Sequence, residues 1–308
     1  MRVFVTGATG YIGSAVVDAL QRASHDVVGL VRHQEKARRL ASRNVHAAVG
    51  TLGNPGTWHL EAASCDVFVH TAFEASAKGP EIDRIAVDAL IELARRAAER
   101  GPAALVYTSG VWVLGSSDAP MDEEAPRNPA EISAWRPAHE DVVLGAAGGN
   151  LRTAVVRPGV VYGGSRGIVS DLLRDAENGL MRIIGSGENH WPVVYDRDLA
   201  DLYARIVGEP TASGIYHAND EGDERVRDIV AAIVDHRPHP PDVRHVPITE
   251  ARAKLGPLAD ALALDQRVRS TRAKALGWAP ALRSVSGNVA RLFEELRRGR
   301  RAEEEQRD

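Results

Sequence analysis

The first thirteen residues constrain the fold most, because they read in turn as a buried strand, a glycine-cornered turn and the start of a helix. Residues 3–5, Val-Phe-Val, form a short apolar run of the kind that a central parallel strand requires. Three glycines follow at the spacing G-x-x-G-x-x-G, at Gly7, Gly10 and Gly13. Gly7 permits a tight turn, Gly10 lets backbone amides approach a ligand, and Gly13 lets the helix pack against the sheet. The free amides and positive dipole end of this helix favour an anion, so the segment predicts a site for a dinucleotide pyrophosphate.

The residue after the second strand sets the expected cofactor preference. Residues 26–31 read as a strand that leads into Arg32, where an acidic side chain would bind the ribose hydroxyls of NAD. A cation at this position accommodates the additional 2′-phosphate of NADP, and Lys36 adds a second phosphate partner. The sequence therefore favours NADP over NAD. The alternative interpretation is an ordinary solvated basic patch at the start of the following helix.

Composition narrows the class of protein. The 308 residues carry a formal net charge of −4 with a pI near 6.3, which gives no electrostatic basis for binding nucleic acid or an anionic membrane. No apolar run is long enough to span a bilayer and no signal peptide precedes the first strand, so we expect a cytoplasmic protein. The single cysteine, Cys65, excludes an intramolecular disulfide and is expected to pack in the core.

Strand and helix patterns alternate along the chain, which is typical of a parallel sheet with crossover helices. The expected strands are 66–70, 103–108 and 151–156, and the expected helices are 81–100, 140–147, 168–178 and 198–207. We therefore predict an α/β fold with a doubly wound parallel sheet (a Rossmann fold) and a small C-terminal substrate-binding region. Residues 1–163 are mainly the dinucleotide-binding domain, and residues 164–296 are mainly the substrate-binding region, with elements that return to the core. Residues 297–308 carry blocks of like charge and are predicted to be a disordered tail.

Five segments resemble landmarks of one enzyme family. They are residues 6–13 (Thr-Gly-Ala-Thr-Gly-Tyr-Ile-Gly), 105–115 (Leu-Val-Tyr-Thr-Ser-Gly-Val-Trp-Val-Leu-Gly), 157–163 (Arg-Pro-Gly-Val-Val-Tyr-Gly), 198–200 (Asp-Leu-Ala) and 276–280 (Leu-Gly-Trp-Ala-Pro). In this order they look like the extended short-chain dehydrogenase/reductases, the NAD-dependent epimerase/dehydratase family. The resemblance implies NAD(P) along the carboxyl edge of the sheet, with a small C-terminal region closing over the nicotinamide. It also implies substrates such as sugar nucleotides, steroids, flavonoids or other alcohols and ketones.

Most of the expected cofactor contacts lie in the glycine turn or just after a strand, where the carboxyl ends of parallel strands meet at one edge. The full set is Gly7, Thr9, Gly10, Tyr11, Ile12, Gly13, Arg32, Lys36, His70, Thr71, Ala72, Thr108, His139 and Pro158.

The catalytic positions depart from the family pattern. The resemblance implies a Ser or Thr that orients the substrate oxygen and a Tyr-x-x-x-Lys pair, in which the lysine lowers the pKa of the tyrosine. Here the segment after the fifth strand reads Thr108-Ser109-Gly110, and Trp135 and His139 stand where the pair is expected. Indole exchanges no proton at neutral pH, so the usual tyrosine mechanism is not open to this chain.

Other side chains are candidates for the missing chemistry. His139, one helical turn after Trp135, would face the same cleft and either contact the cofactor or relay a proton. Ser109 either donates a hydrogen bond to a substrate oxygen or only satisfies backbone groups at the strand end. His190 is the preferred substrate-side acid, with Tyr195 as the phenolic alternative, and packing roles are equally compatible with both residues.

Aromatic residues indicate the character of the substrate site. Trp112, Trp135 and Trp191 are expected to line an apolar cleft, which favours a hydrophobic substrate, although tryptophans in a core would give the same pattern. No spacing of His, Cys or carboxylate residues indicates a metal site.

Three functions are compatible with this sequence. The favoured one is an NADP(H)-dependent oxidoreductase acting on a small carbonyl compound or enone, with a proton supplied by His190, Tyr195 or water. The second is a non-redox isomerase, epimerase or lyase on the same fold. The third is a non-catalytic NADP-binding sensor, for which loss of the Tyr-Lys pair is natural. Related folds dimerise through two helices, here 81–100 and the helix after His139, so a homodimer is also compatible with the sequence.

Overall fold

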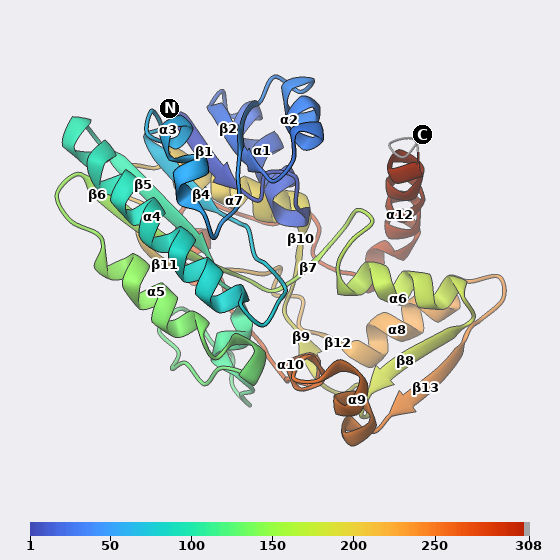
Figure 1. The fold of residues 1–308 in the computed structure, drawn as a ribbon. Coiled ribbons are helices and arrows are strands. Elements are labelled where there is room, and N and C mark those ends of the chain that lie inside the picture. The colour runs from blue at the N-terminus through green and yellow to red at the C-terminus, as the bar shows by residue number, and fades with distance from the viewer. Residues whose placement is uncertain (305–308) are drawn as a thin grey trace.

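A seven-stranded parallel sheet forms the centre of the protein (Figure 1). The computed structural model describes residues 1–304 of the chain. The strands lie in the order β11-β6-β5-β4-β1-β2-β3, with every neighbouring pair parallel. Their bounds are β1 Arg2–Thr6, β2 Asp26–Val31, β3 His46–Val49, β4 Val67–His70, β5 Ala103–Thr108, β6 Leu151–Pro158 and β11 Gly214–Ala218. This confirms the predicted doubly wound sheet, whose strand order reverses between β1 and β4, the point at which such sheets bind ligands.

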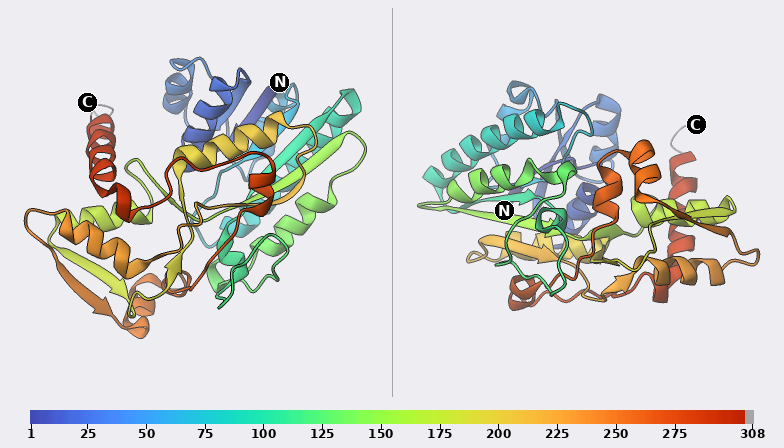
Figure 2. Two further views of the ribbon diagram at one scale, coloured as in Figure 1. Left: turned by 180° about the vertical axis from the view of Figure 1, so that it is seen from behind. Right: turned by 90° about the horizontal axis from the view of Figure 1, so that it is seen from below.

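Helices cover both faces of the sheet (Figures 1 and 2). One face carries α1 (Tyr11–Arg22), α2 (Gln34–Ala41), α7 (Asp196–Gly208) and α11 (Thr271–Ala275), and the other carries α3 (His59–Ala62), α4 (Gly79–Arg100) and α5 (Arg136–Gly145). Strand side chains alternate between the two apolar clusters, as the pleat requires. In β1, for example, Val3 and Val5 pack with the α1 and α7 cluster, whereas Phe4 packs with the α4 cluster.

The second half of the chain builds a smaller region beside the sheet (Figure 1). It contains α6 (Ile168–Glu177), β8 (Leu180–Ile184), α8 (Val226–Asp235), β13 (Asp242–Val246), α9 (Ile248–Leu255), α10 (Leu258–Leu262) and α12 (Val289–Glu304). Short strand pairs β7 (Val160–Tyr162) with β10 (Val193–Tyr195), and β9 (His190–Trp191) with β12 (Glu224–Arg225), join it to the main sheet. Single 3-10 turns occupy Pro55–Thr57, Val111–Leu114, Glu131–Ser133 and Ser286–Asn288. A separate apolar cluster, shared by α6, α8 and α12, forms the core of this region.

Helix α5 begins four residues earlier than predicted. The sequence indicated a start at residue 140, yet the helix begins at Arg136. Pro137 lies in the first turn, where its missing N–H has no helical partner to lose and its fixed φ suits the helix. The early start places Arg136 and His139 on a regular helix.

The predicted disordered tail is wrong for most of its length. Helix α12 continues to Glu304 because Phe293 and Leu296 anchor it in the C-terminal core, and Arg298 pairs with Glu294 one turn earlier. Residues 305–308 of that prediction lie outside the described residues. Within the described chain, no helix is long and apolar enough to cross a membrane.

Candidate active site

The turn between β1 and α1 has the geometry of an anion-binding cradle. Gly7 adopts a φ of +71°, and a side chain on it would meet the backbone of Ala72 at 2.9 Å. A Cβ on Gly13 would stand 2.1 Å from the carbonyl oxygen of Gly7, so a larger residue would displace the turn. Gly10 is the N-cap of α1, which has no side-chain cap and no acidic residue in its first turn. The first amides and the positive dipole end of α1 therefore suit a pyrophosphate.

A cleft of about 600 Å³ extends from this turn past the ends of β2 and β4. The predicted cofactor residues that line it are Gly7, Thr9, Gly10, Tyr11, Ile12, Arg32, Lys36, Thr71 and Ala72. Arg32 and Lys36 stand at the end of β2, where a dinucleotide in this orientation would carry its adenosine ribose. We call this cavity the dinucleotide cleft.

A second, smaller pocket of about 270 Å³ adjoins the dinucleotide cleft through Tyr11 and Ile12, which line both cavities. Its remaining walls come from the segments after β5 and β6 and from the starts of α5 and α6, and we call it the substrate pocket. Ser109 and Trp112, which the sequence predicted for the substrate site, line it, and so does Pro158, which was predicted as a cofactor contact and does not line the dinucleotide cleft. Burial raises the pKa of Tyr11 well above its ordinary value, so its phenol stays neutral and donates to the Gly163 carbonyl.

Ser109 lines the substrate pocket and carries a buried, unsatisfied hydroxyl. The residue is 6% exposed, and its Oγ has no hydrogen-bond partner in the described chain. A buried hydroxyl without a partner is costly, and a ligand oxygen in the pocket would remove that cost. Neighbouring Thr108 lies outside both cavity walls, with its Oγ1 2.5 Å from the hydroxyl of Tyr203.

Arg136 supplies the charge of the substrate pocket, and it is a residue that sequence reasoning missed. Its guanidinium lies 4.4 Å from the ring centroid of Trp135 and 5.4 Å from that of Phe73, and its Nη1 donates to the Thr108 carbonyl at 3.0 Å. Trp135 stacks on Phe73 with centroids 5.5 Å apart, and it does not line either cavity. One feature of the sequence could have indicated Arg136: it is a cation at the first position of a helix, where the helix dipole disfavours positive charge.

His70 and His139 belong to a buried polar network on the α4 face of the sheet. Its centre is Asp83, which lies 2.8 Å from His139 Nδ1 and 3.1 Å from His70 Nε2, and accepts from the Tyr107 hydroxyl at 2.9 Å. Thr6 Oγ1 lies 2.7 Å from the other nitrogen of His70. Burial raises the pKa of Asp83, but the hydrogen bonds from the two histidines outweigh burial and lower this pKa overall.

This network corrects two predictions. His70 does not line the dinucleotide cleft, because its ring is 1% exposed and both of its nitrogens are used inside the network. His139 does not face the cleft beside Trp135, because its Nδ1 is directed at Asp83 and the residue is 7% exposed. The helical spacing located His139 correctly on α5, but the partner on α4 could not be inferred from spacing.

Glu140, the residue of α5 that follows His139, links this helix to the sheet. Glu140 and Arg157 of β6 form a bidentate ion pair of 2.9 and 2.6 Å, and both side chains are almost completely buried. His217 of β11 lies beside the guanidinium, and its burial together with this neighbouring charge lowers its pKa to about 3, so that it is neutral. The pair therefore fixes α5, and with it Arg136, over the ends of β5 and β6.

The candidates near residue 190 lie away from both cavities, contrary to the sequence prediction. His190 Nδ1 is 2.7 Å from Asp265, and Trp191 is buried in the C-terminal core. Tyr195 donates to Glu295 at 2.7 Å, and burial raises its pKa to about 12, which makes it a poor acid at neutral pH. Their side chains hold the C-terminal region together and do not reach the substrate pocket.

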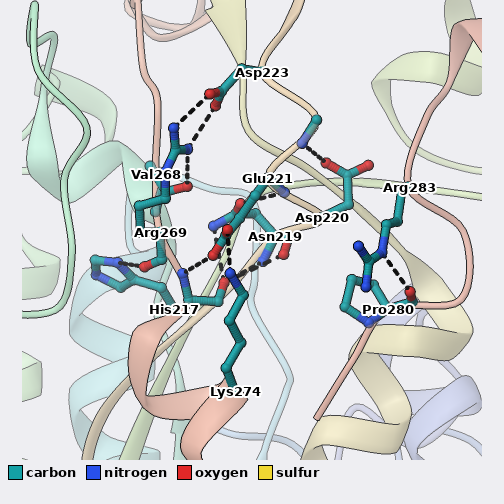
Figure 3. Close-up of polar contacts among 12 residues, drawn as sticks. His217, Asn219, Asp220, Glu221, Asp223, Val268, Arg269, Lys274, Pro280 and Arg283 are labelled. Carbon is teal, nitrogen blue, oxygen red and sulfur yellow. Dashed lines mark hydrogen bonds and ion pairs between the residues drawn. The ribbon is translucent and has the colours of Figure 1, made fainter.

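Ion pairs join the loop after β11 to a late segment of the chain (Figure 3). Arg269 forms a bidentate pair with Asp223 at 2.9 and 2.7 Å, and Lys274 pairs with Glu221. These contacts hold residues 266–274 against the sheet. Gln266, at the start of this segment, donates to the carbonyls of Val111 and Gly115 at 2.9 and 2.8 Å, and so supports a wall of the substrate pocket.

Asp220 stands out within this loop. It is 5% exposed, and its Oδ2 has no hydrogen-bond partner among the described residues, while Oδ1 accepts from the Gly222 amide at 2.8 Å. Burial, with the nearby negative charges of Glu224 and Asp223, raises the pKa of Asp220 to about 7. Over residues 1–304, no group of three or more His, Cys, Asp or Glu side chains is arranged to hold a metal ion.

Comparison with known proteins identifies the family. Residues 3–218 match the NAD dependent epimerase/dehydratase family, and the chain belongs to it. The chain is 34% identical over 300 residues to an uncharacterized protein of Schizosaccharomyces pombe, covering 94% of this chain and 98% of that one. It is 27% identical over 261 residues to a dihydroquinoline-1-oxide ketoreductase of Stigmatella aurantiaca, covering 82% and 78%. The structure of human epimerase family protein SDR39U1 with NADPH has a TM-score of 0.71 at 23% identity, covering 96% and 99%, and shows the same fold.

The family and the cradle together define a nicotinamide dinucleotide as the cofactor. The glycine turn and the uncapped start of α1 fit its pyrophosphate, and a Cβ on Gly13 would disturb the turn that presents these amides. Arg32 and Lys36 would lie at one end of the bound molecule, and Tyr11 and Ile12 at the junction with the substrate pocket. When bound, the nicotinamide supplies or accepts a hydride.

Proposed function

We propose that this protein is an NADP(H)-dependent reductase of a small carbonyl compound or enone, and that it works without a Tyr-x-x-x-Lys pair. The observation that carries the proposal is the substrate pocket, which adjoins the dinucleotide cleft at Tyr11 and Ile12 and is lined by Ser109, whose buried hydroxyl has no partner among the described residues. The ketoreductase among the relatives supports carbonyl reduction. A pocket of about 270 Å³ favours a small substrate.

The choice of NADP rests on the end of β2. Arg32 is exposed and Lys36 is half-buried, and within the described residues neither side chain forms an ion pair. Two unpaired cations beside the adenosine ribose would bind a 2′-phosphate through charge-assisted hydrogen bonds. The related human protein was solved with NADPH, which supports the same choice.

The chemistry depends on positioning rather than on a protein acid. Ser109 would donate a hydrogen bond to the carbonyl oxygen and hold the carbonyl carbon at the mouth of the dinucleotide cleft. Trp112 and the other apolar walls would exclude bulk water from the reacting carbon. The oxygen would take its proton from a water molecule, because the neutral phenol of Tyr11 is committed to Gly163.

The test is NADPH oxidation, followed by absorbance, across a panel of small aldehydes, ketones and enones. We expect turnover with the wild type and a loss of about 10- to 100-fold in kcat for Ser109→Ala. Ser64→Ala, on an exposed surface, is the matched control and should keep wild-type kinetics.

Two results would replace this proposal with another function. Thermal protection by NADP without oxidation of NADPH by any carbonyl would indicate a non-catalytic sensor. Product formation with no net change in the redox state of the cofactor would indicate an isomerase, epimerase or lyase.

A homodimer through α4 and α5 completes the proposal. The two helices lie side by side on one face of the sheet (Figure 1). Ile85 of α4 is 37% exposed. Light scattering should give twice the chain mass, and Ile85→Glu should shift it toward the monomer mass. A monomeric wild type would reject this assembly.

A further inference from the structure

We propose that Arg136 is the anion-binding residue of the substrate pocket, and that the substrate carries a carboxylate one methylene group away from its reducible carbonyl. This inference rests on the proposed reductase function and names its substrate class, a short oxo acid. Its basis is a guanidinium without an acidic partner on the wall of a small, otherwise uncharged pocket.

The charge of Arg136 is not neutralised inside the protein. In the part of the chain that the structure describes, no carboxylate forms an ion pair with it, and one of its five N–H donors is used by the Thr108 carbonyl. Asp83 is close enough for the positive charge to lower its pKa, yet its oxygens already serve His70, His139 and Tyr107. Donors and charge are therefore left for a ligand.

The guanidinium is held in place before a ligand arrives. It lies over Trp135 at 4.4 Å and beside Phe73 at 5.4 Å, two rings that stack with 12° between their planes. Cation–π contacts and the hydrogen bond to Thr108 restrict the rotamers of the arginine. A positioned planar fork binds a carboxylate through two parallel hydrogen bonds at a low entropic cost.

The position of Arg136 assigns it to the substrate rather than to the cofactor. It lines the substrate pocket together with Ser109 and Ser133, and it is not among the residues that line the dinucleotide cleft. Ser133 already donates to the Ala130 carbonyl, so Ser109 is left for the carbonyl oxygen of the substrate. One cation in a pocket of about 270 Å³ suits one carboxylate on a small molecule and is too little for the diphosphate of a sugar nucleotide.

The reaction balances with the cofactor already proposed. The reduced dinucleotide would supply a hydride to the carbonyl carbon, and the π electrons of the C=O bond would move to the oxygen that Ser109 would hold. That oxygen would take a proton from water, so that the products are a hydroxy acid, the oxidised dinucleotide and one hydroxide ion released to solvent. The carboxylate bound by Arg136 is unchanged and serves only to place the carbonyl.

The experiment compares acetoacetate with its neutral isostere acetoacetamide as substrates, using NADPH and the full-length protein. Arg136→Met should raise KM for acetoacetate about 10- to 100-fold, as expected for loss of hydrogen bonds to a charged group, and should leave KM for acetoacetamide unchanged. Arg136→Lys keeps the charge but not the fork and should recover part of the loss. Arg95→Met, on the exposed face of α4, is the matched control and should behave as wild type.

Three outcomes would overturn the inference. An equal fall in kcat for both substrates would make Arg136 a stabiliser of the reacting oxygen, and a weaker NADPH Kd in Arg136→Lys would make it a cofactor contact. If the wild type did not prefer acetoacetate over acetoacetamide, the proposal that the substrate carries a carboxylate would be rejected.

Calorimetry with malonate, which cannot be reduced, separates this inference from the reductase proposal. Malonate binding to the NADP⁺-saturated protein that is lost in Arg136→Met, without turnover of any carbonyl, would support the anion site and reject the reductase. Turnover of acetoacetamide by a protein that binds neither malonate nor acetoacetate would support the reductase and reject the anion site.

Discussion

The dinucleotide cleft and the substrate pocket share the side chains of Tyr11 and Ile12 but are constructed in different ways. The pyrophosphate cradle comes from one continuous segment, residues 7–13, and acts through backbone amides and the absence of side chains. The substrate pocket combines residues 109–112, 133, 136, 158–161 and 167–168, and its polar groups are side chains. A site built from the backbone of one segment can be predicted from the local sequence. A site built from distant side chains depends on the tertiary contacts that bring them together.

Those tertiary contacts are buried polar links. Glu140 with Arg157 holds α5 on the sheet, and Gln266 holds the segment that begins at Val111. We therefore expect changes in these links to disturb the substrate pocket more than the dinucleotide cleft. The following predictions test this difference, from the largest expected effect to the smallest.

Glu140→Gln should lower the free energy of unfolding by about 3–5 kcal/mol, because it leaves the buried guanidinium of Arg157 without its counter-charge. Urea denaturation followed by circular dichroism measures this loss. The double variant Glu140→Leu/Arg157→Met, which removes both charges, should be more stable than Glu140→Gln. A single variant as stable as the wild type would show that the ion pair does not fix α5.

Asp220→Asn should flatten the pH dependence of stability. The folded pKa of Asp220, about 7, lies above its ordinary value of 3.8, so the native state retains a proton that the unfolded state has released. Its contribution to stability is therefore full below about pH 4 and is lost as pH rises toward 7. We expect the wild type to lose about 1–3 kcal/mol from this group between pH 5 and 8, and the variant to lose less.

Unfolding free energies of both proteins at several pH values test this prediction. Asp196, whose pKa burial raises to about 6, should preserve part of the slope in the variant. Parallel pH profiles for the two proteins would contradict the assignment to Asp220.

Gly13→Ala should weaken dinucleotide binding by at least about tenfold, or about 1.4 kcal/mol, because its Cβ would stand 2.1 Å from the Gly7 carbonyl oxygen. Gly145→Ala is the matched control, since a Cβ there meets nothing within 4 Å, and the change should be neutral or slightly stabilising. Fluorescence titration with NADPH measures both. Unchanged NADPH affinity in Gly13→Ala would contradict the claim that the pyrophosphate cradle depends on the absence of a side chain at this position.

Arg32→Asp should reduce the preference for NADPH over NADH by about tenfold, because it removes a phosphate partner and offers a carboxylate to the ribose hydroxyls. Arg95→Asp makes the same change of charge on the exposed face of α4 and controls for long-range electrostatics. The ratio of the two dissociation constants is the measurement, and an unchanged ratio would reject the role of Arg32.

The sequence predicted the sheet and the cradle well because both are encoded locally. Apolar runs marked the strands, and the glycine spacing marked the turn, whose geometry Gly7 and Gly13 determine by steric exclusion. The position of Ser109 after β5 also followed from the motif that ends this strand. Helix α5 was predicted too short, although Pro137 suits the first turn, where a proline loses no helical hydrogen bond.

The remainder of the candidate site could not be predicted from local pattern. The orientation of His139 depends on Asp83, a residue 56 positions away, and this contact cannot be inferred from sequence spacing. Arg136 acquires its role from Phe73 and Thr108, which lie 63 and 28 residues earlier in the chain. Charged residues in the final segment suggested disorder because composition gives no information about long-range ion pairs such as that of Arg300 with Glu177 of α6.

The central claim is that the amides at the start of α1 bind the pyrophosphate of a nicotinamide dinucleotide. Isothermal titration calorimetry of the full-length protein with NADPH, and in parallel with NADH, tests it most directly. The account predicts one equivalent of NADPH bound per chain, more tightly than NADH. The absence of a binding heat with both nucleotides, together with no change in melting temperature, would contradict it.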